Sequence, residues 1–198
     1  MTLDDAASVL AASGDDRSAY DYTTVPWDHT SAERYLEALI DARDARECYP
    51  FAICDARSGE VVGMTRYLSL RWWYDRDVPD ALEIGGTWLS PRVQRSGVNT
   101  EAKWLLLSHA FEEWDVRRVD LKSDARNLRS RRAIERLGAT FEGVLRSWQP
   151  SQVRGEESTP RDTAMFSILR GEWPSVRSQL EDLRRRGAAT TLRDSSIL

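Results

Sequence analysis

The stretch SPRVQRSGVNTEAKWLLL, residues 90–107, places polar side chains where an apolar helix begins. The first N–H groups of a helix lack partners, and the helix dipole puts roughly +0.5 charge at that end. Gly97 lets the backbone bend toward a ligand, Arg95 adds a positive charge, and we expect Asn99 at the N-cap. The loop 94–99, here called the phosphate loop, is therefore a candidate site for a phosphate group. Its residues are Gln94, Arg95, Ser96, Gly97, Val98 and Asn99.

The phosphate loop matches neither of two well-known phosphate-binding motifs. It lacks the Gly-Lys-Ser/Thr end of a P-loop and the glycine spacing of a dinucleotide fingerprint. From its local pattern alone, an ordinary capped connection between a strand and a helix is the alternative interpretation.

A cluster of aromatic residues is the second feature that could bind a ligand. Trp72, Trp73 and Tyr74 lie in a charged segment that reads as a loop, and Trp27 and Trp148 are expected on the same side. Aromatic rings that open onto a cleft can stack on a planar ligand such as a nucleobase. The alternative is that these rings pack in the core or in a lid, because aromatic residues mostly bury area.

Charge and cysteine content argue against several other classes of protein. The 198 residues carry a net charge of -4, so the chain has no global basic surface for nucleic acid. Cys48, Cys54, His29 and His109 do not make a zinc pattern, and we expect no metal site. Without a signal-like start or an apolar run near 18 residues, the chain is expected to be cytoplasmic and not bound to a membrane.

Hydrophobic periodicity and turn residues predict the elements that position these residues. We expect helices over 31–45, from 99 onward, over 127–138 and from 174 onward, and strands over 51–55, 61–70, 81–89, 117–124, 139–148 and about 162–169. Residues 1–24 are weakly patterned, and either a loose arm or a helix and a strand would fit them. The order predicts an α/β (α+β) fold with a mixed, mostly antiparallel sheet and one βαβ crossover. We expect a domain over 25–183, and a flexible tail over 184–198.

Several motifs in order resemble the GNAT superfamily of acyl-CoA-dependent N-acyltransferases, and most closely its ribosomal-protein alanine N-acetyltransferase-like (Rim-type) branch. These motifs are EIGGTWL (83–89), QRSGVNTEAK (94–103), DARNLRS (124–130), LGA (137–139), EGVLR (142–146) and the late RDTAMFSIL (161–169).

The resemblance implies that the phosphate loop holds the pyrophosphate of acetyl-CoA. It also implies that the backbone of Trp88 and Leu89 contacts the pantetheine arm, and that Asn127 contacts the pantetheine or the acetyl end. The chain departs from the family pattern at Asn99, where a small residue is usual.

For catalysis, the resemblance implies Glu83 as the proton acceptor, acting through water, and Ser130 as the donor to the leaving thiolate. A surface carboxylate and a residue at a helix start are the respective alternatives. Some Rim-type relatives carry a carboxylate base where this chain has Gln149, which cannot take a proton.

Together these features predict an N-acetyltransferase that moves an acetyl group from acetyl-CoA to a primary amine. The favoured acceptor is a small amine, such as an aminoacyl-nucleotide or an antibiotic-like compound, which stacks on Trp72, Trp73, Tyr74 and Trp148. A protein N-terminus of the ribosomal-protein type, or a non-catalytic acyl-CoA-binding module, are the alternatives. A homo-oligomer is compatible with the sequence.

Overall fold

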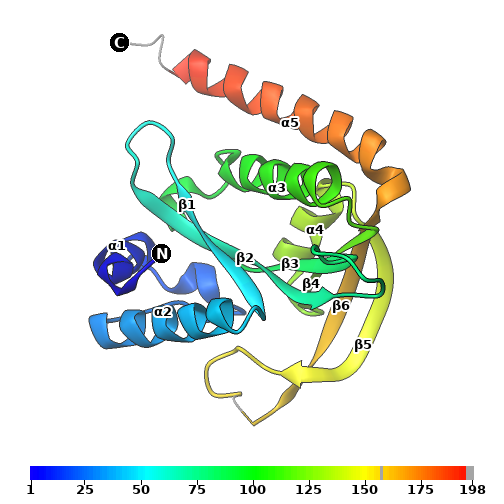
Figure 1. Cartoon of the computed structure of the whole chain (residues 1–198). Helices are drawn as coiled ribbons and strands as arrows, with labels where there is room; N and C mark the ends of the chain where they lie inside the picture. Colours follow the sequence, from blue (N-terminus) through cyan, green and yellow to red (C-terminus); the bar gives the residue numbers. More distant parts are fainter. Residues whose placement is uncertain (157, 195–198) are drawn as a thin grey trace.

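The chain folds as a six-stranded sheet with helices on both faces (Figure 1). The structure, a computed structural model, describes residues 1–156 and 158–194. The strands are β1 (Cys48–Cys54), β2 (Val61–Arg71), β3 (Ala81–Leu89), β4 (Arg118–Asp124), β5 (Thr140–Pro150) and β6 (Pro160–Leu169). The helices are α1 (Ala6–Ser13), α2 (His29–Asp44), α3 (Val98–Ser108), α4 (Leu128–Arg136) and α5 (Trp173–Asp194). Short 3-10 turns are η1 (Leu3–Asp5), η2 (Ser18–Tyr20), η3 (Pro91–Val93) and η5 (Arg170–Glu172), and a π-helical turn, η4 (His109–Glu113), extends α3.

The strand order is β1-β2-β3-β4-β6-β5, and only β3 and β4 run parallel. These two strands are joined through α3, which is the single βαβ crossover that the sequence predicts. All other neighbours are antiparallel. The predicted mixed, mostly antiparallel sheet is thus confirmed.

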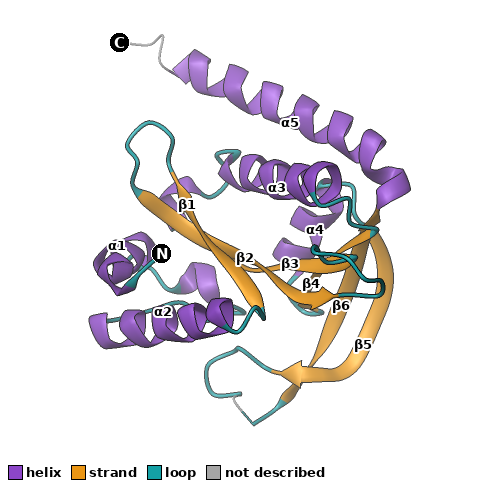
Figure 2. Cartoon of the chain, viewed as in Figure 1, coloured by secondary structure: helices purple, strands orange, loops and turns teal. Residues whose placement is uncertain are grey.

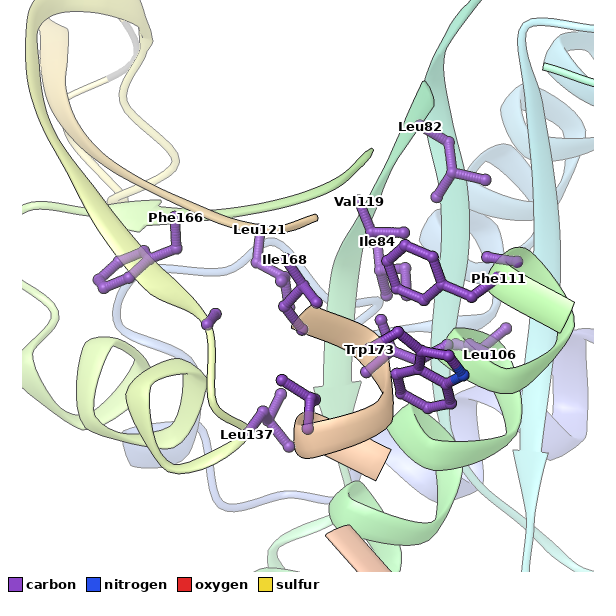
Figure 3. Packing of buried hydrophobic residues seen from close by; sticks show 14 of the residues in the cluster. Leu82, Ile84, Leu106, Phe111, Val119, Leu121, Leu137, Phe166, Ile168 and Trp173 are labelled. Carbon is purple, nitrogen blue, oxygen red and sulfur yellow. The ribbon is translucent and has the colours of Figure 1, made fainter. Parts of the chain in front are cut away.

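Helices α1 and α2 cover one face of the sheet, while α3, α4 and α5 cover the other (Figures 1 and 2). The larger core lies under α3, α4 and α5 and includes Leu107, Leu121, Phe166 and Trp173 (Figure 3). A second core lies under α1 and α2, where Leu36 packs with Val9, Met64 and Trp88. The sheet therefore has an apolar interior on both faces across β2 and β3, the strands that lead to the phosphate loop.

Helix α2 begins earlier than the sequence suggested. Its N-cap is Asp28, whose side chain accepts a hydrogen bond from the backbone N–H of Ser31 at 2.7 Å. The hydroxyl of Ser31 accepts in return from the N–H of Asp28. This reciprocal pair is a capping box. It starts the helix at His29, so the expected start at Ser31 was two residues too late.

Residues 1–24 contain η1, α1 and η2, and α1 packs on α2 and β2 through buried Ala6, Val9 and Ala12. At the other end, α5 continues to Asp194. The last part of the expected flexible tail, 195–198, lies outside the described residues. The division into an arm, a domain over 25–183 and a tail stays a prediction.

Candidate functional site

Strands β3 and β4 separate halfway along their length. They pair only from Ala81 opposite Arg118 to Glu83 opposite Asp120, although β3 continues to Leu89 and β4 to Asp124. Gly85 and Gly86 follow the last pair, and Gly86 has a left-handed φ of 57°. The register between β2 and β3 shifts at this point, which indicates a bulge. The bulge turns β3 away from β4, so an opening forms between the strand ends, where ligands bind in such sheets.

The phosphate loop lies at the end of β3 and leads directly into α3. Gly97, with φ 93°, is the N-cap of this helix, so the expectation of Asn99 at the N-cap was wrong. A glycine takes the cap because L-residues with a side chain rarely adopt this conformation. In the part of the chain that the structure describes, the N–H groups of Val98, Asn99 and Thr100 have no acceptor. A Cβ atom on Gly97 would meet nothing within 4 Å.

Hydrogen bonds fix the phosphate loop to its surroundings. The side-chain amide of Gln94 donates to the carbonyl of Leu89 at 3.2 Å, and its oxygen accepts from Arg129 of α4 at 3.5 Å. Ser96 donates its hydroxyl proton to Val93 O at 2.6 Å. Arg95 has an exposed side chain and a φ of 66°. Free N–H groups at a helix N-terminus, open space at Gly97 and an adjacent arginine fit the diphosphate of a nucleotide.

Trp88 and Leu89 are the last residues of β3, and they differ in what they contact. The indole of Trp88 is buried and donates to the hydroxyl of Tyr35 at 3.2 Å, so its side chain belongs to the second core. The carbonyl of Leu89 already accepts from Tyr20 and Gln94. A pantetheine group that donates a hydrogen bond to the Leu89 carbonyl would therefore share this acceptor with Tyr20 and Gln94.

Asn127 and Ser130 form the N-terminus of α4. Asn127 is the N-cap, and its side-chain oxygen accepts from the N–H of Ser130 at 3.0 Å. Among the described residues, the hydroxyl of Ser130 has no hydrogen-bond partner. Arg129 of the same turn reaches Gln94, so the N-terminus of α4 lies close to the phosphate loop. Asn127 is thus the N-cap, and Ser130 lies at the helix start, as its alternative interpretation has it, with a hydroxyl that is available for another partner.

Glu83 is buried, at 4% exposure, and lies where β3 and β4 separate. Its Oε2 is 2.9 Å from Nζ of Lys122 on β4 and accepts a hydrogen bond from Ser69 on β2 at 3.2 Å. The carboxylate is thus held by side chains of both neighbouring strands, at the last position where β3 pairs with β4. A proton acceptor could act there, and the simple surface carboxylate is excluded because the residue is buried.

None of the four aromatic residues expected at the acceptor site lines the cavity around Arg66 that is described below. Trp72, Trp73 and Tyr74 are 47%, 51% and 59% exposed and lie in the loop before β3. The carboxylate of Asp80 accepts from the N–H groups of Trp73 and Tyr74, and Arg117 lies over the ring of Tyr74. The loop that contains Trp72, Trp73 and Tyr74, here called the aromatic loop, is therefore anchored at the beginning of β3. The phosphate loop follows the end of β3. Trp148, 53% exposed, lies on the edge strand β5.

A cavity that the sequence did not indicate lies on the other side of the Gly86 bulge. It has a volume of about 220 Å³ and is here called the Arg66 cavity. It is lined by Thr23, Thr24, Tyr35, Ala38, Leu39, Ala42, Arg66, Gly86 and Gln152. The loop after η2, helix α2, strands β2 and β3 and the segment after β5 thus all contribute to its walls. The only sequence signal for this place was the Gly-Gly pair inside a strand, which often marks a bulge.

Lys103 is a second residue that the sequence analysis missed. It is buried, at 4% exposure, on the sheet side of α3. Its ammonium donates to the hydroxyls of Thr87 at 2.6 Å and Thr65 at 3.2 Å. No carboxylate in the described structure lies within ion-pair distance, and burial lowers the pKa of Lys103 to about 7. Buried lysines without a partner shift in this direction because desolvation penalises the charged form.

Two further searches concern the described residues only. They contain no group of three or more His, Cys, Asp and Glu side chains arranged to hold a metal ion. None of their helices combines the length and hydropathy that a membrane span requires.

Comparison with known proteins agrees with the resemblance in the sequence. Residues 1–140 match the Acetyltransferase (GNAT) domain family. Over 144 residues, 68% of this chain and 74% of the relative, the chain is 28% identical to Probable N-acetyltransferase YjcK of Bacillus subtilis (strain 168). A GCN5-related N-acetyltransferase from Brucella melitensis has a TM-score of 0.74 at 28% identity, covering 89% of this chain and 76% of that chain. Mycobacterium smegmatis RimJ, solved in complex with CoA-disulfide, has a TM-score of 0.72 at 21% identity. This match covers 92% of this chain and 86% of that chain, and at this identity it shows a likeness of fold alone.

Proposed function

The chain belongs to the GNAT acetyltransferase family, and on this premise we propose that it transfers the acetyl group of acetyl-CoA to the nitrogen of a primary amine. The observation that carries the proposal is the opening between β3 and β4, which has the phosphate loop at one end and Glu83 at the other. We place this reaction in the cytoplasm.

The phosphate loop would hold the pyrophosphate of acetyl-CoA. The N–H groups of Val98, Asn99 and Thr100 point out of the start of α3, and Arg95 adds a mobile positive charge. Gln94 keeps the loop against the end of β3 through its bond to Leu89. The unpaired edge of β3 beyond Glu83 offers backbone groups to the pantetheine arm, and the side-chain amide of Asn127 lies at the start of the facing helix.

When bound, acetyl-CoA supplies a thioester carbonyl for the amine to attack. A neutral amine forms the new C–N bond, the C–S bond breaks, and the amine loses one proton while the thiolate gains one. Glu83 accepts the amine proton through a water molecule, and the unpartnered hydroxyl of Ser130 donates to the thiolate. No covalent intermediate with the protein is needed, because holding both reactants together can lower the barrier by about 7–11 kcal/mol.

We favour a small amine as the acceptor. The Arg66 cavity, at about 220 Å³, is smaller than the roughly 300–1,000 Å³ typical of sites for drug-sized ligands. A compound the size of an amino acid, or one end of an aminoacyl-nucleotide or antibiotic-like amine, would fit such a volume. The absence of a carboxylate at Gln149 also separates this chain from those Rim-type relatives that have a base at that position.

A protein N-terminus is the second candidate acceptor. Its support is the similarity of fold to RimJ and a match of 32% identity over 88 residues to a protein named as a ribosomal N-acetyltransferase, YdaF of Bacillus subtilis. An N-terminal residue could enter the same cavity with its chain directed outward.

One screen tests the proposal. The purified protein is incubated with acetyl-CoA and a library of small amines and peptides, including ribosomal-protein N-termini. Free thiol is measured, and acetylated products are identified by mass spectrometry. We expect thiol release with at least one small amine. Acetylation of peptides in preference to every small amine would contradict the acceptor class, and acetyl-CoA binding without thiol release by any amine would favour the non-catalytic module.

A further inference from the structure

Arg66 on β2 has no counter-charge in the structure. Its Nε is buried without a hydrogen-bond partner, and in the described part of the chain its guanidinium makes neither a hydrogen bond nor an ion pair. The residue as a whole is partly exposed, but a buried Nε without an acceptor is costly. Arg71 and Arg131 also have an unpartnered buried Nε, but each forms a hydrogen bond through another nitrogen. Arg161 shares the unpartnered Nε, but it has the carboxylates of Asp124 and Glu83 as charged neighbours.

The bulge of β3 makes the space that this guanidinium occupies. A Cβ atom at Gly86 would lie 2.4 Å from Nε of Arg66, so only glycine allows the side chain to lie across the strand here. The same two residues line the Arg66 cavity. The arginine is therefore positioned beside the cavity by a local distortion of the sheet, with its Nε buried.

The remaining walls of the cavity are uncharged. Thr23, Thr24, Tyr35 and Gln152 carry polar groups, and the α2 side is apolar. Burial raises the pKa of Tyr35, so its phenol stays protonated. Because none of the described residues that line the cavity is acidic, a cationic group has no partner among them, whereas an anion meets Arg66.

Arg66 and Glu83 are diagonal neighbours on the same face of the sheet. Arg66 pairs with Gly85 and Leu68 pairs with Glu83, so the two charged residues are two positions apart across β2 and β3. Such neighbours have Cβ atoms within roughly 7–8 Å. A small molecule with an amine at one end and an anion at the other could therefore place its amine toward Glu83 and its anion toward Arg66.

We propose that the Arg66 cavity is the acceptor subsite and that Arg66 binds an oxyanion, carboxylate or phosphate, carried by the acceptor amine. This inference rests on the proposed function, because it names the acceptor class of the same site. The planar guanidinium matches both oxyanions through paired hydrogen bonds.

Matched pairs of amines test the proposal. Amino acids, including β-alanine, are compared with their carboxamides, and O-phosphoethanolamine is compared with ethanolamine. A peptide without a carboxylate near its N-terminus is a further probe. Binding is followed by saturation-transfer NMR and turnover by thiol release, for the wild type, Arg66→Gln, Arg66→Lys and Arg170→Gln. Arg170, on η5, is half exposed and pairs with Asp115, so its substitution removes the same charge elsewhere.

We expect the wild type and Arg170→Gln to bind at least one anionic amine at least tenfold more tightly than its neutral partner. Arg66→Gln should bring that ratio close to one, and Arg66→Lys should restore part of it. The two pairs of probes show which oxyanion is preferred. An Arg66→Gln variant that keeps the wild-type ratio, or a wild type that binds both partners or the peptide equally, would overturn the inference.

The two proposals can fail separately. Turnover of neutral and anionic amines at equal rates would leave the acetyl transfer intact and remove the role of Arg66. Arg66-dependent binding of an anionic amine without thiol release would keep the subsite and remove the proposed reaction. If no amine binds and none is acetylated, both proposals are wrong.

Discussion

Glu83 on β3 and Lys122 on β4 form an ion pair, 2.9 Å between Oε2 and Nζ, at the point where their strands stop pairing. Next to this pair, the carboxylate of Asp120 on β4 pairs with Arg71 of β2 and with Arg118 of its own strand. The opening of the sheet is therefore bridged by charged side chains, and Glu83 is held in place by Lys122 and Ser69 together. A carboxylate fixed in this way is suited to receive a proton without moving.

We expect Glu83→Gln to lower kcat by about 10²–10⁴ if proton transfer limits the rate, because the amide keeps the shape but cannot accept a proton. Steady-state kinetics from mildly acidic to alkaline pH measure this. Glu142→Gln is the matched control, since Glu142 is a carboxylate on β5 that pairs with Arg118 and lies outside the opening. A Glu83→Gln enzyme with wild-type kcat at every pH would remove Glu83 from the mechanism.

Gly97→Glu should raise the KM for acetyl-CoA by tenfold or more. The new carboxylate would block the close approach of the backbone and repel the pyrophosphate. Gly59→Glu is the control for backbone strain. Gly59, in the β1–β2 turn, has a positive φ of 74°, and Gly97 has one of 93°. At both glycines a Cβ atom would meet nothing within 4 Å. Equal acetyl-CoA affinity in the two folded variants would contradict a phosphate site at the loop.

Lys103 should make the stability of the fold depend on pH. Its pKa is about 7 when folded and near the ordinary value of 10.5 when unfolded. Between these values the unfolded chain binds a proton that the folded chain does not, so the free energy of unfolding rises with pH across this window, by at most about 1.4 kcal/mol per pH unit. Below about pH 7 both states are protonated, and the dependence ends.

The measurement compares denaturant unfolding of the wild type and Lys103→Met between pH 7 and 9.5. We expect the variant to be more stable than the wild type near pH 7, with the difference shrinking as pH rises. Thr65 and Thr87 remain satisfied in the variant, because their hydroxyls bond to each other at 2.9 Å. A stability difference that stays constant across this range would show that Lys103 does not titrate in it.

Most of the fold could be predicted from the sequence, because local patterns specify it. The strand expected over 81–89, which ends before Pro91, has the bounds of β3, and Gly138, the last residue of the helix expected over 127–138, follows α4 with a φ of 93°. Helix starts were less accurate. Helix α2 begins at His29, two residues before the expected start, and Gly97 caps α3 two positions before Asn99, which is also a good cap residue.

The candidate site was harder to predict, because it depends on contacts between distant segments. Arg66 has no sequence signal beyond a charge in a strand, and its importance arises only where Gly86 and α2 enclose it. Lys103 likewise looks like a surface residue of a helix until the helix packs on Thr65 and Thr87. The phosphate loop was visible in the sequence because a helix N-terminus and its preceding loop are local features.

The aromatic loop gives the last prediction, since its role as a stacking platform remains a hypothesis. Trp72 and Trp73 are half exposed, and Arg71 lies over the ring of Trp73. If they stack on a planar acceptor, Trp72→Ala or Trp73→Ala should raise the KM for an aminoacyl-nucleotide and leave that for an aliphatic amine unchanged. Stacking contributes about 1–3 kcal/mol per base on aromatic platforms, so the rise should be about five- to 150-fold. If both KM values rise equally, these rings contribute packing. If neither changes, then the acceptor binds away from this loop, which is the result expected if the Arg66 cavity alone holds it.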